Sequence, residues 1–281
     1  MADQNRPSGE TVTYSAGSGL GLMPVLRDLY EGFHHSAIWR AFAWNEIEQR
    51  YRRSTLGIAW IVLTYFFFVA TISAFFGGFT TRDTASFVSY VALGYASFMF
   101  LVGNITDGCV VFKKAATWIK STSLPYSVYI YRSITRLLFI FAIQLVSAFI
   151  TLPFLGWRPT WSMLEAVPAF LLFVITGLWL QLFFGVMASR WRDVTHLVAA
   201  ISRLLFFTTP ILWVYSERTG LRKDLAGFNP LTHFLEIFRA PILGEPAAPE
   251  SWTIALIWSI VGAITALSVA SLMQRRLPFW V

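Results

Sequence analysis

Charged residues are scarce in this sequence. Only 13% of the 281 residues are Asp, Glu, Lys or Arg, against roughly 25% in soluble domains, whereas 56% are hydrophobic. A soluble core cannot bury that much apolar surface, so the composition excludes an ordinary soluble protein. The net charge of +7 is divided among segments between the apolar runs and forms no single basic stripe, which argues against a nucleic-acid partner.

Residues that form disulfides or bind metals are few as well. Cys109 is the only cysteine, which excludes an internal disulfide framework. The four histidines, His34, His35, His196 and His233, do not have the spacing of metal ligands. We therefore predict no metal site and no redox chemistry.

Motifs that carry catalysis are missing too. The sequence has no G-x-x-x-x-G-K-[ST] phosphate loop, so this chain is not expected to bind a nucleotide itself. It also lacks G-x-S-x-G, H-E-x-x-H and a pair of carboxylates inside the apolar runs. No catalytic residue is predicted, and an integral membrane glycosyl- or acyltransferase, which needs such pairs, is the less favoured alternative.

Long apolar runs are what the sequence has instead. Six of them approach the roughly 20 residues that cross a bilayer as a helix. They are Leu56–Phe79, Phe87–Phe112, Ile130–Phe154, Val167–Ala188, Val194–Tyr215 and Thr253–Met273. We expect an all-α integral membrane protein with six transmembrane helices. Most of the 22 Lys and Arg residues lie on the side of the N-terminus, which predicts that both termini are cytoplasmic.

Two segments precede the first span. Residues 1–36 are predicted to be a flexible cytoplasmic tail, because the first twenty are rich in Ser, Gly and Thr and lack the apolar core of a secretory signal. Residues 37–281 then form the six-span domain. Residues 37–51 have the period of an amphipathic helix lying in the membrane interface, although a helix packed on cytoplasmic surfaces is an alternative. The residues expected to carry this interface helix are Trp44, Ile47, Tyr51, Arg52 and Arg53.

The last external segment, residues 216–251, is too apolar for a plain loop. Asn229 followed by Pro230 is typical of a helix start, with Asn as the N-cap and Pro in the first helical position. Leu231, Phe234 and Phe238 then share a helical face up to a break at Pro241. We expect a short helix pair that dips into the outer leaflet or packs there.

Three ordered segments carry a resemblance to a known family. The first is the basic stretch Arg50–Trp60, RYRRSTLGIAW, which enters the first predicted span. The second joins Arg190, Arg192 and Asp193 to Pro210 and Trp213, and the third runs from Asn229 and Pro230 to Arg239 and Pro241. From about Ala37 onward the chain resembles the permease subunits of ABC-type polysaccharide exporters, which handle O-antigens, capsules and teichoic acids.

This resemblance implies a homodimeric permease in the bacterial inner membrane. It implies two copies of a separate ATPase subunit, which would bind ATP and Mg²⁺, and a lipid-linked polysaccharide as the substrate. The missing phosphate loop agrees with that division of labour. A drug or lipid exporter of the same superfamily, also in contact with membrane lipids, is the alternative.

The resemblance places the ATPase-coupling helix between the second and third spans. Two helical turns fit there before Pro125, with Trp118 and Ile119 as apolar anchors for a groove in the partner. The basic residues of the segment are Lys113, Lys114 and Lys120. The alternative is an inert basic loop that only fixes the topology.

Five residues are candidates for the substrate path. Arg203 lies inside the fifth predicted span, where a charge is costly and should face a polar cavity or a partner. It could contact a substrate phosphate, or it could pair with Asp107 near the inner end of the second span. Trp60, Tyr65, Trp213 and Tyr215 could stack on sugar rings, although core or interface positions are more common for such residues.

Overall fold

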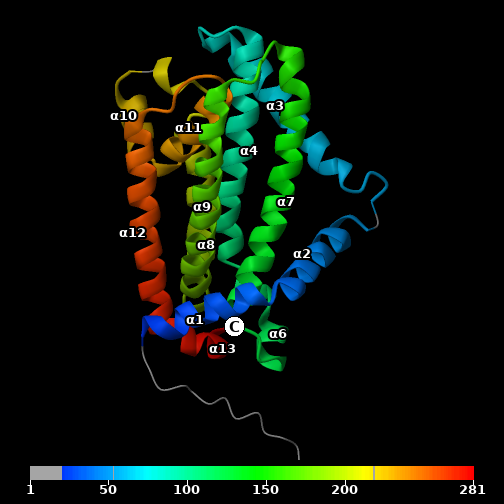
Figure 1. The fold of residues 1–281 in the computed structure, drawn as a ribbon, viewed down its shortest axis with the longest axis vertical. Helices are drawn as coiled ribbons and strands as arrows, with labels where there is room; N and C mark the ends of the chain where they lie inside the picture. Colours follow the sequence, from blue (N-terminus) through cyan, green and yellow to red (C-terminus); the bar gives the residue numbers. More distant parts are fainter. Residues whose placement is uncertain (1–20, 53, 218) are drawn as a thin grey trace, which may run out of the picture.

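The computed structural model describes residues 21–52, 54–217 and 219–281, a helical bundle without a strand in that part of the chain (Figure 1). Long helices stand side by side, and short helices lie across both ends. The α-helices are α1 Leu22–His34, α2 Ser36–Tyr51, α3 Ala59–Phe76, α4 Thr84–Gly108, α5 Val111–Lys114, α6 Ala116–Ser121, α7 Ser127–Thr151, α8 Ala166–Arg190, α9 Asp193–Thr208, α10 Leu221–Phe228, α11 Pro230–Ile242, α12 Pro249–Met273 and α13 Leu277–Trp280. The 3₁₀-helices are η1 Gly77–Phe79, η2 Leu152–Leu155, η3 Trp161–Glu165, η4 Tyr215–Glu217 and η5 Gln274–Arg276. The predicted all-α fold is confirmed.

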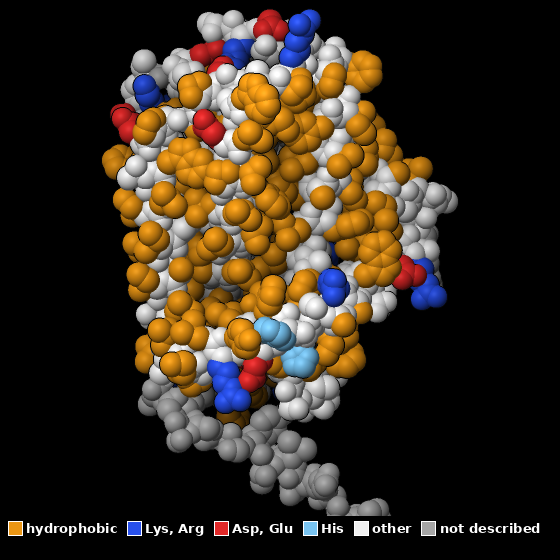
Figure 2. All heavy atoms as spheres, in the orientation of Figure 1, with side chains coloured by type: hydrophobic (Ala, Val, Ile, Leu, Met, Phe, Trp, Pro, Cys, Tyr) orange, Lys and Arg blue, Asp and Glu red, His pale blue; other side chains and the backbone are white. Residues whose placement is uncertain are grey.

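Five helical segments in the described residues are long and apolar enough to cross a membrane. They are Ala59–Phe79, Thr84–Gly108, Ser127–Leu155, Trp161–Arg190 and Pro249–Met273. Figure 2 shows hydrophobic side chains over the middle of one face, with charged side chains mainly towards its two ends. Such a band between two polar ends is what a bilayer-spanning bundle requires. The chain is a multi-pass membrane protein.

The fifth predicted span differs from the sequence expectation. Val194–Tyr215 was expected as one helix, but α9 ends at Thr208 and has 16 residues. At 1.5 Å per residue it is about 24 Å long, less than the roughly 30 Å of a bilayer core. The helix ends because Pro210 disfavours a helical conformation at Thr209, which is extended with φ −82° and ψ 136°. The count of six spans stays a prediction.

We call the two ends of the bundle the α6 end and the α11 end. At the α6 end, α1 packs across α7 and α12 (Figure 1). The predicted flexible tail is therefore wrong for residues 22–34, where Val25 and Gly32 are buried against the bundle. Residues 1–20 lie outside the described residues. The helix predicted at 37–51 is confirmed as α2, which packs on α7.

At the α11 end, the expected helix pair is present as α10 and α11. Asn229 is the N-cap of α11 and accepts a hydrogen bond from the Leu231 backbone N–H, with Pro230 in the first helical position, as predicted. The predicted break at Pro241 is one residue early, because α11 includes Pro241 in its last turn and ends at Ile242. Phe234, Leu235 and Phe238 are buried, so α11 packs into the bundle between α4, α8 and α12.

Candidate functional site

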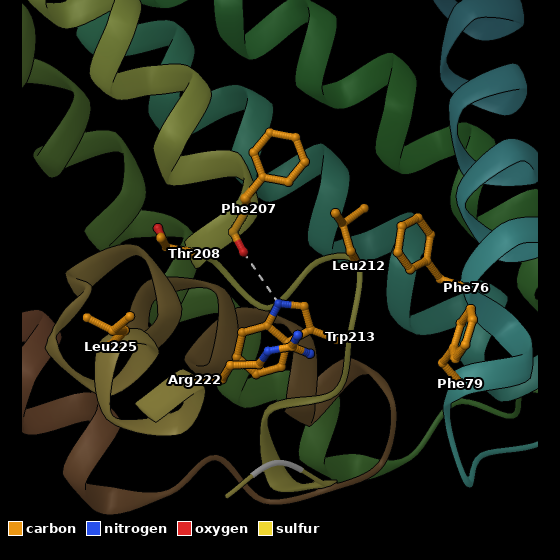
Figure 3. A pocket seen from close by; sticks show the side chains of 8 residues that line it. All are labelled: Phe76, Phe79, Phe207, Thr208, Leu212, Trp213, Arg222 and Leu225. Atoms are coloured by element: carbon orange, nitrogen blue, oxygen red, sulfur yellow. Dashed lines mark hydrogen bonds between the residues drawn. The ribbon is translucent and has the colours of Figure 1, made fainter. Parts of the chain in front are cut away.

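A pocket opens at the α11 end between α3 and α9. Its volume is about 510 Å³ (Figure 3). The lining residues are Phe76, Phe79, Phe207, Thr208, Leu212, Trp213, Arg222 and Leu225. Most of this lining is aromatic or aliphatic, and Arg222 is its charged member. Such a surface suits a ligand that has apolar faces and an anionic or hydroxyl-bearing group.

The early end of α9 creates this pocket. Because the helix stops at Thr208, the chain from Thr209 to Val214 is irregular and carries Trp213 to the pocket wall. The Trp213 indole N–H lies 3.5 Å from the Phe207 carbonyl oxygen, the dashed line in Figure 3. Trp213, predicted as a path residue, therefore lines a real pocket, whereas the sequence did not single out Phe76, Phe79 or Arg222.

Arg239 of α11 links several elements at the α11 end through polar contacts. Its side chain is fully buried, and its guanidinium donates to the Pro210 carbonyl at 3.0 Å and to the Tyr90 hydroxyl at 2.7 Å. The guanidinium carbon also lies 3.4 Å from the centre of the Tyr90 ring, and Glu236 contributes an ion pair at 3.1 Å. A Cβ on Gly94 would approach the guanidinium within 2.9 Å, so this glycine makes room for it. The sequence pattern places Arg239 in the third motif but does not predict its burial.

The remaining residues of the third sequence motif fix α11 in the same place. The Asn229 side-chain amide donates to the Thr209 hydroxyl at 2.8 Å, while its oxygen caps α11. The Pro241 carbonyl accepts a hydrogen bond from Ser162 at 3.0 Å. Pro210, Asn229 and Arg239 thus join the end of α9 to α11, and Pro241 joins α11 to η3. This arrangement holds the wall of the pocket in position.

A cluster of charged side chains lies near the α6 end. Arg136 of α7 is buried and forms an ion pair with Asp107 of α4. Glu46 of α2 lies 3.2 Å from Arg136 and 3.7 Å from Arg132, and Lys114 lies 3.9 Å from Glu46 and 4.0 Å from Asp107. We call these five residues the charge cluster. It ties α2 to two long helices and to α5.

The cluster corrects the prediction for Arg203. Asp107 pairs with Arg136 and Lys114, so the proposed Arg203–Asp107 pair is wrong. Arg203 is exposed on α9 and forms no ion pair with the described residues. A charge on an exposed helix face between apolar residues is costly in lipid, so we expect it to meet water, a partner chain or a substrate. Its contact with a substrate phosphate stays a prediction.

The segment expected to contact an ATPase forms two short helices, α5 and α6. Trp118 of α6 is 47% exposed, whereas Ile119 is 3% exposed and packs in the core. The prediction of two exposed anchors is therefore wrong for Ile119. Lys120 is exposed, and Lys113 donates to the Thr195 hydroxyl at 3.3 Å. Pro125 lies outside both helices, two residues before α7 begins.

Residues 38–243, almost three quarters of the chain, match the family described as ABC-2 type transporter. The chain belongs to this family. α1 and α12 lie outside the matched residues. The match includes the pocket, the charge cluster and both short helices at the α6 end.

Two curated proteins are similar to this ABC-2 chain over nearly its whole length. The O-antigen export system permease protein RfbA of Myxococcus xanthus is 19% identical over 257 residues, which covers 91% of this chain and 97% of that protein. The protein of the same name from Klebsiella pneumoniae is 21% identical over 235 residues, covering 83% and 90%. The recognised resemblance to polysaccharide-export permeases is thereby confirmed, and transport by a membrane subunit is the activity class.

The other aromatic path candidates of this ABC-2 chain occupy three different environments. Trp60 is 43% exposed in the first turn of α3. Tyr65 is 1% exposed and donates its hydroxyl to the Ala92 carbonyl at 3.0 Å, so it is a core residue and the path prediction is wrong for it. Tyr215 lies in η4, where its backbone N–H meets the Tyr90 hydroxyl at 3.4 Å.

The remaining predicted residues lie where α8 meets α9 and on α2. Arg190 stacks against Trp191 and Trp280, and Arg192 and Asp193 are exposed at the start of α9. In α2, Ile47 is buried but Trp44 is 55% exposed, so the predicted apolar face is only partly the packed one. Tyr51 and Arg52 end this helix, and Arg53 lies outside the described residues.

Sequence reasoning missed the charge cluster. Arg132 and Arg136 stand four residues apart inside the third predicted span, so they share one face of α7. Two arginines on one face of a membrane helix are costly without acidic partners, and that was the available signal. They were counted only as charges that set the orientation.

Proposed function

We propose that this chain is the transmembrane subunit of an ATP-driven exporter that moves a lipid-linked polysaccharide across the bacterial inner membrane. Two copies of the chain pair with two copies of a separate ATPase, which binds ATP and Mg²⁺. The observation that carries the proposal is the similarity to two O-antigen export permeases over nearly the full length of the chain. The missing phosphate loop supports a separate ATPase.

The exposed side of α9 supports the homodimer. Val198 is the one residue of α9 that is buried, and Leu197, Leu204 and Phe207 are each at least 60% exposed. Arg203 lies on the same mostly exposed helix. A second copy of the chain facing α9 would cover part of this surface and leave Arg203 beside a shared conduit. There a guanidinium can hold the phosphate of a lipid carrier by paired hydrogen bonds.

The pocket between α3 and α9 supports a sugar-bearing amphiphile as the substrate. The indole of Trp213 and the rings of Phe76 and Phe207 offer flat faces to sugar rings or an apolar chain. Arg222 can contact hydroxyl or phosphate groups at the mouth. The exposed indole of Trp118 on α6 supports an ATPase contact at the opposite end.

Orientation can be tested with two engineered cysteines. Cys109 is buried, and replacing it by Ala leaves a background without thiols. We expect Arg222→Cys to be labelled in intact spheroplasts by an impermeant maleimide, and Lys120→Cys only after the membrane is opened. The reverse pattern would show that the α6 end faces outward and would refute the proposed direction.

The function itself is tested in a strain that lacks this gene. We expect surface polysaccharide to disappear and its lipid-linked form to accumulate on the cytoplasmic side, with rescue by the wild-type chain. Rescue should fail when the partner ATPase carries an inactivating change in its phosphate loop. Normal surface polysaccharide together with altered drug sensitivity or lipid export would instead favour a drug or lipid exporter.

A further inference from the structure

Helix α1 has three distinct sides. Successive residues of an α-helix are turned by about 100°, so positions three and four apart share a side. Val25, Asp28, Leu29 and Gly32 form the side that packs on the bundle. The second side is exposed and apolar, and the third carries charge. The second side consists of Leu22, Met23, Leu26, Tyr30 and Phe33, which are 41% to 75% exposed.

The packed side of α1 is fixed by specific contacts with α7. The Asp28 carboxylate accepts hydrogen bonds from the backbone N–H groups of Tyr126 and Ser127 at 2.8 and 2.9 Å, and the Ser127 hydroxyl donates to the Asp28 carbonyl at 2.6 Å. A Cβ on Gly32 would lie 2.0 Å from the Ser127 hydroxyl oxygen, so the two helices are in close contact. The rotation of α1 about its own axis is therefore set.

These contacts show which way the apolar side points. Asp28 meets the first residues of α7, whereas the Leu29 carbonyl accepts from Tyr131, one turn further along α7 towards the α11 end, at 3.0 Å. The Phe33 ring also meets the Tyr131 ring, at 5.9 Å between centroids. The exposed apolar side includes Phe33 and adjoins Leu29 on the helix, so it continues the outer surface of the spans. The charged side adjoins Asp28, which meets the start of α7, so it faces away from the spans.

The charged side chains Arg27, Asp28 and Glu31 of α1 already have partners within the chain. Arg27 forms an ion pair with Glu31 at 2.6 Å, and Asp28 is occupied by α7. The helix therefore offers no basic patch to an anionic surface, and its exposed apolar side is its means of attachment. A partner protein docked at the α6 end would meet the charged side first.

We propose that α1 is an interfacial helix whose side formed by Leu22, Met23, Leu26, Tyr30 and Phe33 lies in the lipid of the leaflet at the α6 end. The packed, apolar and charged sides of α1 then face protein, lipid and water, respectively. Asp28 of α1 accepts hydrogen bonds at the start of α7, the helix that follows α6. Contact between α1 and lipid therefore also holds the start of α7 in position. The proposal requires only that the chain spans a membrane, so it does not depend on the exported substrate.

Spin labels on α1 test this contact. In the full chain with Cys109→Ala, reconstituted in phosphatidylcholine nanodiscs, labels are attached at Met23→Cys and Tyr30→Cys. Arg27→Cys on the charged side of the same helix is the matched control. We expect the first two labels to collide more with lipid-soluble oxygen than with a water-soluble nickel chelate, and the control label to do the opposite. Addition of anionic phosphatidylglycerol should not change this pattern.

Three outcomes would overturn the proposal. Equal nickel access at all three positions would place the apolar side in water. Nickel access that is lost only when the ATPase subunit is added would assign the surface to a protein partner. Oxygen access that appears only with anionic lipid would show an electrostatic attachment. Two labelled positions, both on exposed side chains, protect the test against disturbance by a single label.

Discussion

Arg136 of α7 pairs with Asp107 of α4 and lies 3.2 Å from Glu46 of α2. One buried guanidinium thus holds α2 and α4 against α7. Lys114 of α5 reaches both carboxylates within 4.0 Å, so the residues leading to α6 belong to the same network. A displacement of α6 by a partner would therefore reach α2 and α4 through this cluster as well as through the backbone.

Removal of Arg136 should destabilise the protein strongly. Arg136→Ala leaves Asp107 and Glu46 without their shared partner, which costs about 3–5 kcal/mol for a buried pair. We expect a clearly lower melting temperature in detergent, partly recovered when Asp107→Asn is added. Arg203→Ala is the matched control, because this arginine is exposed and unpaired within the described residues, and its melting temperature should stay at the wild-type value.

Arg203 should affect export without affecting stability. Lysine keeps the charge but not the paired hydrogen bonds of a guanidinium, so Arg203→Lys should reduce export and Arg203→Ala should reduce it further. Surface polysaccharide measured at equal amounts of inserted protein gives the comparison. Full export by the alanine variant would remove Arg203 from the substrate path.

Substitution of Trp118 should weaken binding of the ATPase subunit, whereas substitution of Ile119 should weaken the fold. Trp118→Ala removes an exposed aromatic anchor that can contribute ~2 kcal/mol or more to an interface, so recovery of the ATPase subunit in pull-downs should fall roughly tenfold or more. Its melting temperature should fall less than that of the Ile119 variant, because the half-exposed Trp118 ring packs on the Phe42 ring, at 5.2 Å between centroids. Ile119→Ala empties a core position and should lower the melting temperature instead, at a cost of about 2–5 kcal/mol. ATPase recovery unaffected by Trp118→Ala would show that α6 is not the contact.

Asp28 should stabilise the start of α7, although it belongs to another helix. The N-cap residue of α7, Tyr126, makes no side-chain cap, and Asp28 supplies the acceptor in its place. Asp28→Ala should cost about 0.5–2 kcal/mol, as the loss of a capping residue does. Hydrogen exchange at Tyr126 and Ser127 should rise. Arg27→Ala, which breaks only an exposed pair on the same helix, should leave that exchange unchanged.

The hydroxyl group of Tyr90 should contribute to the stability of the fold. Tyr90→Phe keeps the ring beneath Arg239 but removes the oxygen that accepts its hydrogen bond, a loss of about 1.5–3 kcal/mol for a charged donor. We expect a lower melting temperature and greater protease sensitivity of residues 219–229. Tyr95→Phe is the control, because its ring stacks on Phe68 and the Tyr95 hydroxyl has no hydrogen-bond partner among the described residues. Equal melting temperatures for both variants would show that the hydrogen bond from Arg239 to the Tyr90 hydroxyl does not stabilise the fold.

The sequence by itself determined the features that depend on local patterns. Apolar runs of sufficient length require helices in a bilayer, because the backbone has no other partner there, and this gave the all-α membrane fold. Asn229 and Pro230 start α11 as expected, since an N-cap acts within its own first turn. The ordered motifs likewise indicated the family before any contact was known.

Only the tertiary structure decided which polar groups meet. Asp107 and Arg136 are 29 residues apart, and the choice of Arg136 over Arg203 depends on how α4 packs against α7 and α9. Ile119 and Trp118 are neighbours, yet only the docking of α6 puts one in the core and leaves the other exposed. Periodicity gives the sides of a helix, but the free energy of burying or pairing a charge depends on the neighbours that packing supplies.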